Sequence, residues 1–291
     1  MEFRILGPLE VVDEGRQLAL GAAKQRALLA LLLLHANEVV SSERLVEELW
    51  DGRPPAKAIK SVQVYVSQLR KALGATRLET RGQGYVLHVE PTDLDSRRFE
   101  ALVGEARKAV EQGEARRAAE TLRTALAVWR GSALADFRYE QFAQAEIARL
   151  EELRLTAMED RIEADLALGR DAELVPELEA LVGAEPLRER TRAQLMLALY
   201  RSGRQADALG QYQAARRVLD DQLGLQPGRA LQELERAILD QDEALGVSGR
   251  KLIAPARSPG RRGLVMIGAA LIFAAGLAAA VKRRLGSPNP R

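Results

Sequence analysis

The spacing of hydrophobic positions changes along this chain and predicts strands first and helices afterwards. Residues 3–20 alternate between apolar and polar around Asp-Glu-Gly at 13–15, which predicts two strands joined by a turn. Residues 24–36 (KQRALLALLLLHA) predict an apolar helix whose charge-free core is too short to cross a membrane. A second helix is predicted after Ser41, because hydroxyl groups can cap its start and DGRPP at 51–55 ends it.

Residues 57–86 predict a helix with one apolar and one basic face, followed by a short hairpin whose turn is marked by Gly82 and Gly84. Residues 53–85 contain seven Lys or Arg and a single acid, Glu79. Such a helix suits a DNA major groove, with the hairpin on the adjoining backbone; the plain alternative is a solvated basic face on an ordinary α+β domain. The apolar stripe comprises Ile59, Val62, Val66, Leu69 and Leu73, and the opposite face carries Lys57, Ser61, Val64, Gln68 and Lys71.

Residues 94–245 have helical patterning throughout, and three glycines divide them into repeats. Each of Gly113, Gly169 and Gly203 is followed by residues of similar character five, nine and twelve positions later. This shared register predicts helix–turn–helix repeats resembling the tetratricopeptide type, with the second helix of each pair packing inward. The inward residues are Ala118, Leu122 and Ala125, then Leu174, Leu178 and Leu181, then Ala208, Tyr212 and Ala215.

The end of the sequence predicts a membrane anchor. Residues 263–281 contain 19 positions without a charge, and basic residues flank both ends. Since about 20 helical residues cross a bilayer core, we expect one transmembrane helix; the alternative is a buried helix of a third domain. The protein would lie at the cytoplasmic membrane, with residues 1–262 inside. Pairs of small residues spaced by four would let two spans pack as a homodimer; they are Ala270 with Ala274 and Gly276 with Ala280.

The composition and motifs argue against an enzyme. The sequence has no Cys, which excludes disulfides, thiolate metal sites and thiol catalysis. His35 and His88 have no carboxylate or hydroxyl partner at motif spacing, so structural or surface roles are favoured for them. No phosphate-binding loop, G-x-G-x-x-G after a strand, His-Glu-x-x-His or Gly-x-Ser-x-Gly motif occurs. We therefore expect no catalysis, no metal and no cofactor.

The net charge of +2 hides a strong segregation of charge. Residues 1–91 hold 12 basic and 11 acidic groups, residues 92–245 hold 22 and 30, and residues 246–291 hold 9 and none. Because an acidic middle repels DNA, contact with nucleic acid is expected in the first 91 residues only.

Two parts of the sequence resemble a known family of regulators. Residues 20–50, 54–55, 62–74 and 81–87 are similar to the OmpR/PhoB-type winged-helix domain, in the variant found in the Streptomyces antibiotic regulatory protein family. Residues 93–103, 125–137, 149–170 and 186–242 resemble the bacterial transcriptional activator domain that follows it in that family. The expected fold is mainly α, with a winged helix at 1–91, an all-α repeat domain at 92–245, a basic linker at 246–262, the span at 263–281 and a tail at 282–291.

The resemblance implies a sequence-specific DNA-binding activator that binds direct repeats in promoters, contacts RNA polymerase and controls secondary-metabolite genes. The competing hypothesis is a membrane-anchored helical-repeat scaffold whose winged helix binds protein instead of DNA. Helix geometry and alignment to the family's recognition helix assign base reading to Ser61, Val64, Tyr65 and Gln68. The expected phosphate contacts are Lys57, Lys60, Arg70 and Lys71, with Lys24, Arg26 and Ser42 near helix starts. Arg81 and Gln83 belong to the wing, and Arg81 is the candidate for the minor groove.

Overall fold

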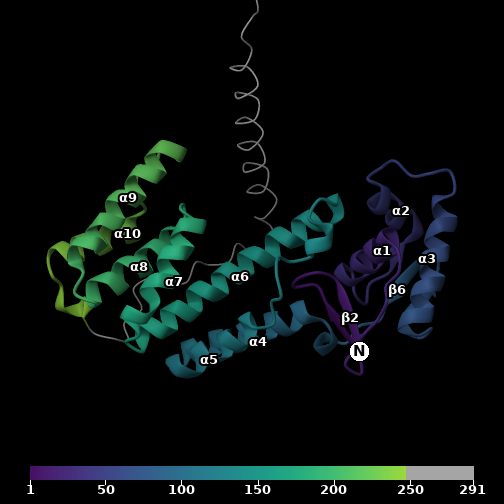
Figure 1. Cartoon of the computed structure of the whole chain (residues 1–291), viewed down its shortest axis with the longest axis horizontal. Helices are drawn as coiled ribbons and strands as arrows, with labels where there is room; N and C mark the ends of the chain where they lie inside the picture. Colours follow the sequence, from purple (N-terminus) through teal and green to yellow (C-terminus); the bar gives the residue numbers. More distant parts are fainter. Residues whose placement is uncertain (247–291) are drawn as a thin grey trace, which may run out of the picture. The chain divides into compact units, whose positions relative to one another are not determined.

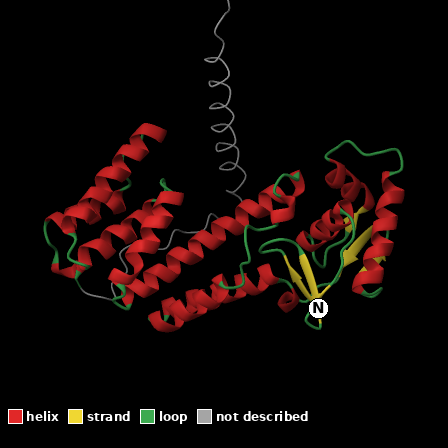
Figure 2. Ribbon diagram, viewed as in Figure 1, coloured by secondary structure: helices red, strands yellow, loops and turns green. Residues whose placement is uncertain are grey.

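The computed structural model describes residues 1–246 of the chain. Strands gather at the N-terminal part and helices make up the rest (Figure 2). The predicted segments 263–281 and 282–291, and all of the linker after Gly246, lie outside the described residues.

The first part of the chain has two small antiparallel sheets around three helices (Figure 1). One sheet has the order β1-β2-β3 and the other β4-β6-β5. The elements are β1 (Glu2–Arg4), β2 (Glu10–Asp13), β3 (Arg16–Gln17), α1 (Ala23–Leu34), β4 (Val40–Ser41), α2 (Ser42–Trp50), α3 (Ala58–Leu73), β5 (Leu78–Arg81) and β6 (Gly84–Leu87).

The predicted strand pair with its turn is β2 and β3, in which Asp13 pairs with Arg16 across a two-residue turn. Both turn residues, Glu14 and Gly15, have positive φ, as a tight hairpin turn requires. The sequence pattern did not predict β1 and β4 as separate strands. They are three and two residues long, too short to show an alternation of their own.

The three predicted helices are present, and their local chemistry explains their ends. The Ser41 hydroxyl accepts a hydrogen bond from the Arg44 N–H at the start of α2. The predicted apolar stripe of α3 is buried except for Ile59, whose side chain is 52% exposed. The stripe is centred on Val62 and Leu69, and Ile59 lies about 60° around the helix from that centre, so Ala58 takes the core position in the first turn.

The second part is a row of antiparallel helices (Figure 1). Its helices are α4 (Asp95–Glu111), α5 (Ala115–Leu126), α6 (Gln141–Ala167), α7 (Asp171–Ala184), α8 (Glu189–Arg201), α9 (Gln205–Leu223) and α10 (Arg229–Leu239), with 3-10 turns at Pro91–Asp93, Ala135–Phe137 and Glu243–Leu245.

The predicted repeat register is confirmed. Gly113, Gly169 and Gly203 end α4, α6 and α8 with nearly identical φ of +77°, +76° and +78°. In each turn the residue after the glycine donates its N–H to the carbonyl four residues before the glycine. All the predicted inward residues are buried apart from Leu181, which is partly buried. Three turns of one geometry therefore connect α4 to α5, α6 to α7 and α8 to α9.

The transmembrane part of the expected fold class is corrected. Within residues 1–246, no helix combines the length and the apolar character needed to cross a membrane. Residues 263–281 lie outside this range, so nothing in the structure supports a span or a homodimer built on one. Seven Ala and three Gly make the segment only moderately hydrophobic, and length without charge is necessary for a span but not sufficient. The expected single-pass location in the cytoplasmic membrane is withdrawn with it.

Candidate nucleic-acid interface

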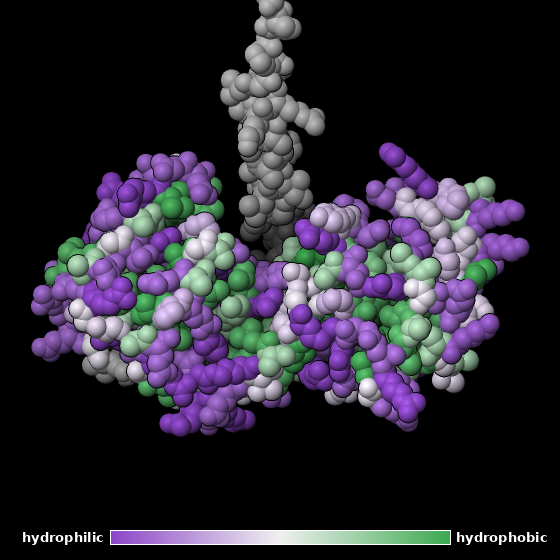
Figure 3. Space-filling view, in the orientation of Figure 1, coloured by the Kyte–Doolittle hydropathy of each residue, from purple (hydrophilic) through white to green (hydrophobic). Residues whose placement is uncertain are grey.

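One side of α3 is open to solvent because the opposite side is buried in the core. Hydrophilic side chains, with a few apolar ones, gather over this helix in Figure 3. The helix contains no acidic residue. Its exposed residues, here called the open face, are Ile59, Lys60, Gln63, Val64, Ser67, Gln68 and Lys71. A face of this kind, with polar, basic and a few apolar residues but no acid, can enter a major groove.

The four predicted base-reading residues do not share this face equally. Val64, 46% exposed, and Gln68 lie on the open face. Ser61 is half-buried, and its hydroxyl donates to the Lys57 carbonyl at 3.3 Å. Tyr65 is half-buried and packs against the hydrophobic core. Ser61 and Tyr65 therefore lie at the edge of the surface that a base pair could reach.

Gln63 and Ser67 were not among the predicted base readers, although both lie on the open face. Their signal was present in the sequence, because 60, 63, 64, 67, 68 and 71 follow the spacing of one helical face. Helix geometry combined with alignment to a recognition helix selected a partly different set. A Gln carries both a donor and an acceptor for a base edge, so Gln63 is as suited to this work as Gln68.

The predicted wing is the β5–β6 hairpin, and it is joined to the start of α2. Arg81 and Gln83 are exposed at its tip. Both the N–H and the hydroxyl of Ser42 donate to the Gln83 carbonyl, at 3.0 and 2.8 Å. Gly84 permits this approach, since a Cβ there would lie 2.4 Å from the Val40 carbonyl oxygen. Ser42, predicted as a phosphate ligand, thus makes hydrogen bonds that orient the wing.

The predicted phosphate contacts fall into two groups. Lys57, Lys60 and Lys71 are exposed, and no ion pair reaches them in the part of the chain that the structure describes. Arg70 instead holds the wing, because its guanidinium donates to the Leu78 carbonyl at 2.7 Å and to the Thr80 hydroxyl at 2.6 Å. Lys24 and Arg26, like Arg70, already have partners within the protein, and theirs are carboxylates of the helical repeats.

Glu79, the single acid among residues 53–85, is hydrogen-bonded to a histidine. His88 Nε2 lies 3.0 Å from the Glu79 carboxylate. This hydrogen bond, aided by the charge of Arg81, lowers the pKa of Glu79 below its ordinary value. The pairing accounts for His88 as a surface residue beside the wing, as its sequence context predicted.

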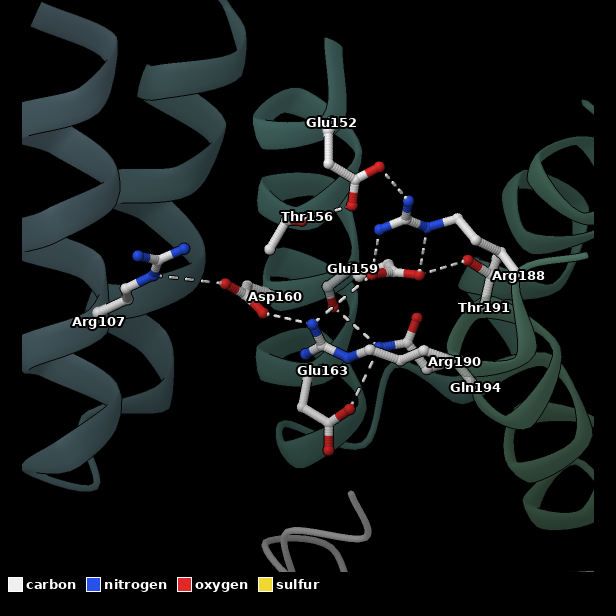
Figure 4. A network of polar contacts seen from close by, with 10 residues as sticks. All are labelled: Arg107, Glu152, Thr156, Glu159, Asp160, Glu163, Arg188, Arg190, Thr191 and Gln194. Atoms are coloured by element: carbon white, nitrogen blue, oxygen red, sulfur yellow. Dashed lines mark hydrogen bonds and ion pairs between the residues drawn. The ribbon is translucent and has the colours of Figure 1, made fainter. Parts of the chain in front are cut away.

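A large group of charged side chains lies in the repeats, where it joins α6 to the start of α8. Figure 4 shows Glu159 of α6 between Arg188 and Thr191, which donate to its carboxylate at 2.8–3.0 Å. The hydrogen bond with Glu159 is also the main reason why the pKa of Arg188 is raised. Nearby, the buried carboxylate of Asp165 accepts hydrogen bonds from Arg123, Arg161 and Arg170. Among the described residues no cluster of His, Cys, Asp or Glu could hold a metal ion.

Comparison with known proteins agrees with this geometry. A model of the bacterial transcriptional activator domain matches residues 94–239, and a model of the C-terminal domain of transcriptional regulatory proteins matches residues 15–87. These two matches, on a winged helix followed by helical repeats, define a transcriptional regulator and not an enzyme.

The relatives narrow this class to a family. The chain is 41% identical to the regulatory protein DnrI of Streptomyces peucetius over 267 residues, which are 88% of this chain and 98% of DnrI. It is 44% identical to the regulatory protein AfsR of Streptomyces coelicolor over 84% of this chain, but only 25% of AfsR. The chain belongs to the Streptomyces antibiotic regulatory protein family, as the sequence motifs implied.

A solved structure shares the architecture. It is Mycobacterium tuberculosis EmbR in complex with a low-affinity phosphopeptide, which superposes with a TM-score of 0.81 at 34% identity. The match covers 97% of this chain and 71% of EmbR.

Proposed function

We propose that this regulator binds specific DNA sequences by placing the open face of α3 in the major groove and the β5–β6 wing on the adjoining strand. The observation that carries the proposal is the open face itself. It includes Lys60 and Lys71, and Lys57 precedes the helix; all three lysines are exposed, the described residues place no ion pair on them, and the helix has no acid. Free cations of this kind release counterions from phosphates and supply most of the non-specific affinity for DNA.

Base reading then falls to the uncharged residues of the same face. Gln63 and Gln68 can make paired hydrogen bonds with an adenine edge, and the Val64 methyl groups can meet a thymine methyl. Ser61 and Tyr65 would reach bases only at the edge of the contact. Arg81 at the wing tip is placed to enter the minor groove, where the negative potential attracts a guanidinium.

The wider role follows from the family. We propose that residues 1–91 act as the DNA-binding domain and residues 92–245 as the activator domain, and that the protein activates secondary-metabolite genes. The names of the relatives and of the matched domains support this. Direct repeats in a promoter would place two copies of the chain side by side. RNA polymerase would be the partner of the DNA-bound regulator.

The first experiment selects a binding sequence from random duplexes and measures affinity by fluorescence anisotropy between 50 and 200 mM salt, where about 0.9 of log–log slope corresponds to each phosphate contact. We expect Lys71→Ala to make the slope shallower, reducing its magnitude by about 0.9. Its control is Lys108→Ala, since Lys108 is equally exposed but lies on α4, away from the open face.

Two further variants separate base reading from backbone contact. Gln68→Ala should relax the choice at one base pair, at a cost of about 1–3 kcal/mol, and Arg81→Ala should weaken all sequences more evenly. If the unmodified chain shows no salt-dependent retention on any duplex, the proposal fails and a winged helix that binds protein takes its place.

A further inference from the structure

Two of the predicted phosphate ligands face the helical repeats. Lys24 Nζ donates to the Leu49 carbonyl at 2.7 Å and lies 3.6 Å from the carboxylate of Glu140. An Arg26 guanidinium nitrogen lies 2.5 Å from the carboxylate of Asp136. We call these four charged residues, Lys24, Arg26, Asp136 and Glu140, the junction cluster. Each cation of the cluster therefore already has a carboxylate partner, whereas Lys57, Lys60 and Lys71 have none among the described residues.

The junction cluster lies away from the wing. The wing meets α2 at its first residue, Ser42. Leu49, which Lys24 contacts, lies seven residues further along α2, or about 10 Å at the rise of an α-helix. A phosphate bound at the wing tip would thus be near the opposite end of α2 from Lys24.

The cluster forms part of a continuous attachment between the winged helix and the repeats. The Asp136 carboxylate accepts the Leu9 N–H at 2.8 Å as well as pairing with Arg26. The Asp95 carboxylate accepts the N–H groups of Ile5 and Leu6, in the same N-terminal segment as Leu9, at 2.8 and 3.0 Å. The two parts also share one hydrophobic core, which extends from the first strand into α6. The backbone of residues 5–9 is therefore bonded to the repeats.

Lys24 extends this attachment to the helix that supports the recognition helix. The Leu49 carbonyl is among the last four of α2, which have no donor within the helix, and a cation there also suits the helix dipole. Since α2 packs on α3 and also contacts α6, the Glu140–Lys24–Leu49 chain connects the repeats to the helix-turn-helix.

We propose that the junction cluster holds the helix-turn-helix in a fixed orientation on the repeats, so that Lys24 and Arg26 are positioning residues and not phosphate ligands. This inference rests on the proposed DNA-binding function. It predicts that the repeats determine where the DNA lies relative to the activator domain, without touching the DNA themselves.

The test removes the two acids and keeps both cations, with Asp136→Asn and Glu140→Gln in the full chain. By hydrogen exchange, the Leu9 amide should exchange about tenfold faster in Asp136→Asn, which loses the charged hydrogen bond to it. It should change by less than about twofold in Glu140→Gln, whose partly exposed ion pair is with Lys24 and not with residues 5–9. The salt slope of DNA binding should stay unchanged in both. A steeper slope with tighter binding would mean that the freed cations bind phosphate, and would overturn the proposal.

A second readout separates positioning from simple stabilisation. The chain has no Cys, so Ala180→Cys on the exposed side of α7 gives one labelling site. Energy transfer from this label to a label at the end of the DNA should show a broader distance distribution in the two acid variants, at a temperature where all proteins are folded. Arg26→Gln should broaden it as well, and Arg26→Lys should restore it in part. An unchanged distribution would leave the cluster with a stabilising role only and refute the positioning proposal. Absence of DNA binding by the unmodified chain would instead refute the proposed function, and the exchange result would still stand.

Discussion

Replacing Asp95 with Ala should be among the most destabilising single changes outside the apolar core. Its side chain is 2% exposed at the start of α4, and its two carboxylate oxygens accept the N–H groups of Ile5 and Leu6. An Arg130 guanidinium nitrogen lies 3.7 Å from the carboxylate. Burial raises the pKa of Asp95, in spite of these hydrogen bonds and of Arg130. The carboxylate is therefore held in a site that disfavours its charge but needs its two acceptors.

The magnitude follows from what the Ala variant leaves behind. Two buried N–H groups lose their acceptor, at about 1–3 kcal/mol each. Removing the buried charge, which its partners compensate only in part, offsets some of this loss of stability. We expect a net loss of about 2–4 kcal/mol in the free energy of unfolding. For a unit of this size that corresponds to a fall in Tm of about 5–15 °C.

Urea unfolding of the full chain, followed by far-UV circular dichroism, measures this loss as a lower midpoint at unchanged m-value. The matched control is Asp207→Ala, since Asp207 pairs with Arg204 on an exposed helix surface, where the loss should be below about 1 kcal/mol. If the two variants lose the same stability, the bonds from Asp95 to residues 5 and 6 do not hold the winged helix on the repeats.

Three further predictions concern stability. Asp165→Asn should destabilise by about 3–5 kcal/mol, because a buried carboxylate that meets three arginines is lost; urea unfolding measures it, and a loss below 1 kcal/mol would contradict it. Gly203→Ala should cost about 1–2 kcal/mol from positive φ alone, since the space around a Cβ there is open; calorimetry checks this. Because the folded pKa of Asp95 is raised above 3.8, its contribution to stability is fully present at lower pH and declines as the pH rises through the folded value. Asp95→Asn should flatten that decline in a pH series of unfolding curves.

The local elements of this fold could be predicted because their signals are local. A Ser hydroxyl at a helix start, an Asp-Glu-Gly turn and a glycine after the first helix of each repeat act within a few residues of themselves. The open face of α3 could also be predicted in outline, and Lys60, Val64, Gln68 and Lys71 do lie on it. Helix geometry and alignment together assigned Ser61 and Tyr65 to it, but both are half-buried, and Tyr65 packs against the core.

What the sequence could not show is which distant group each charged side chain meets. Lys24 and Arg26 have the residue type and helix-start position of phosphate ligands, and only the folded chain brings Asp136 and Glu140 to them from more than a hundred residues away. The same limit applies to Arg70, whose partners are on the wing.

The sequence by itself therefore determined the kinds of element, their order, the repeat register and the family, because periodicity and turn chemistry depend on neighbours along the chain. The tertiary structure decided which cations remain free for a ligand and which bind carboxylates within the protein. It also decided that the winged helix and the repeats share one core. Burial and ion pairing depend on neighbours in space, and a one-dimensional pattern does not contain that information.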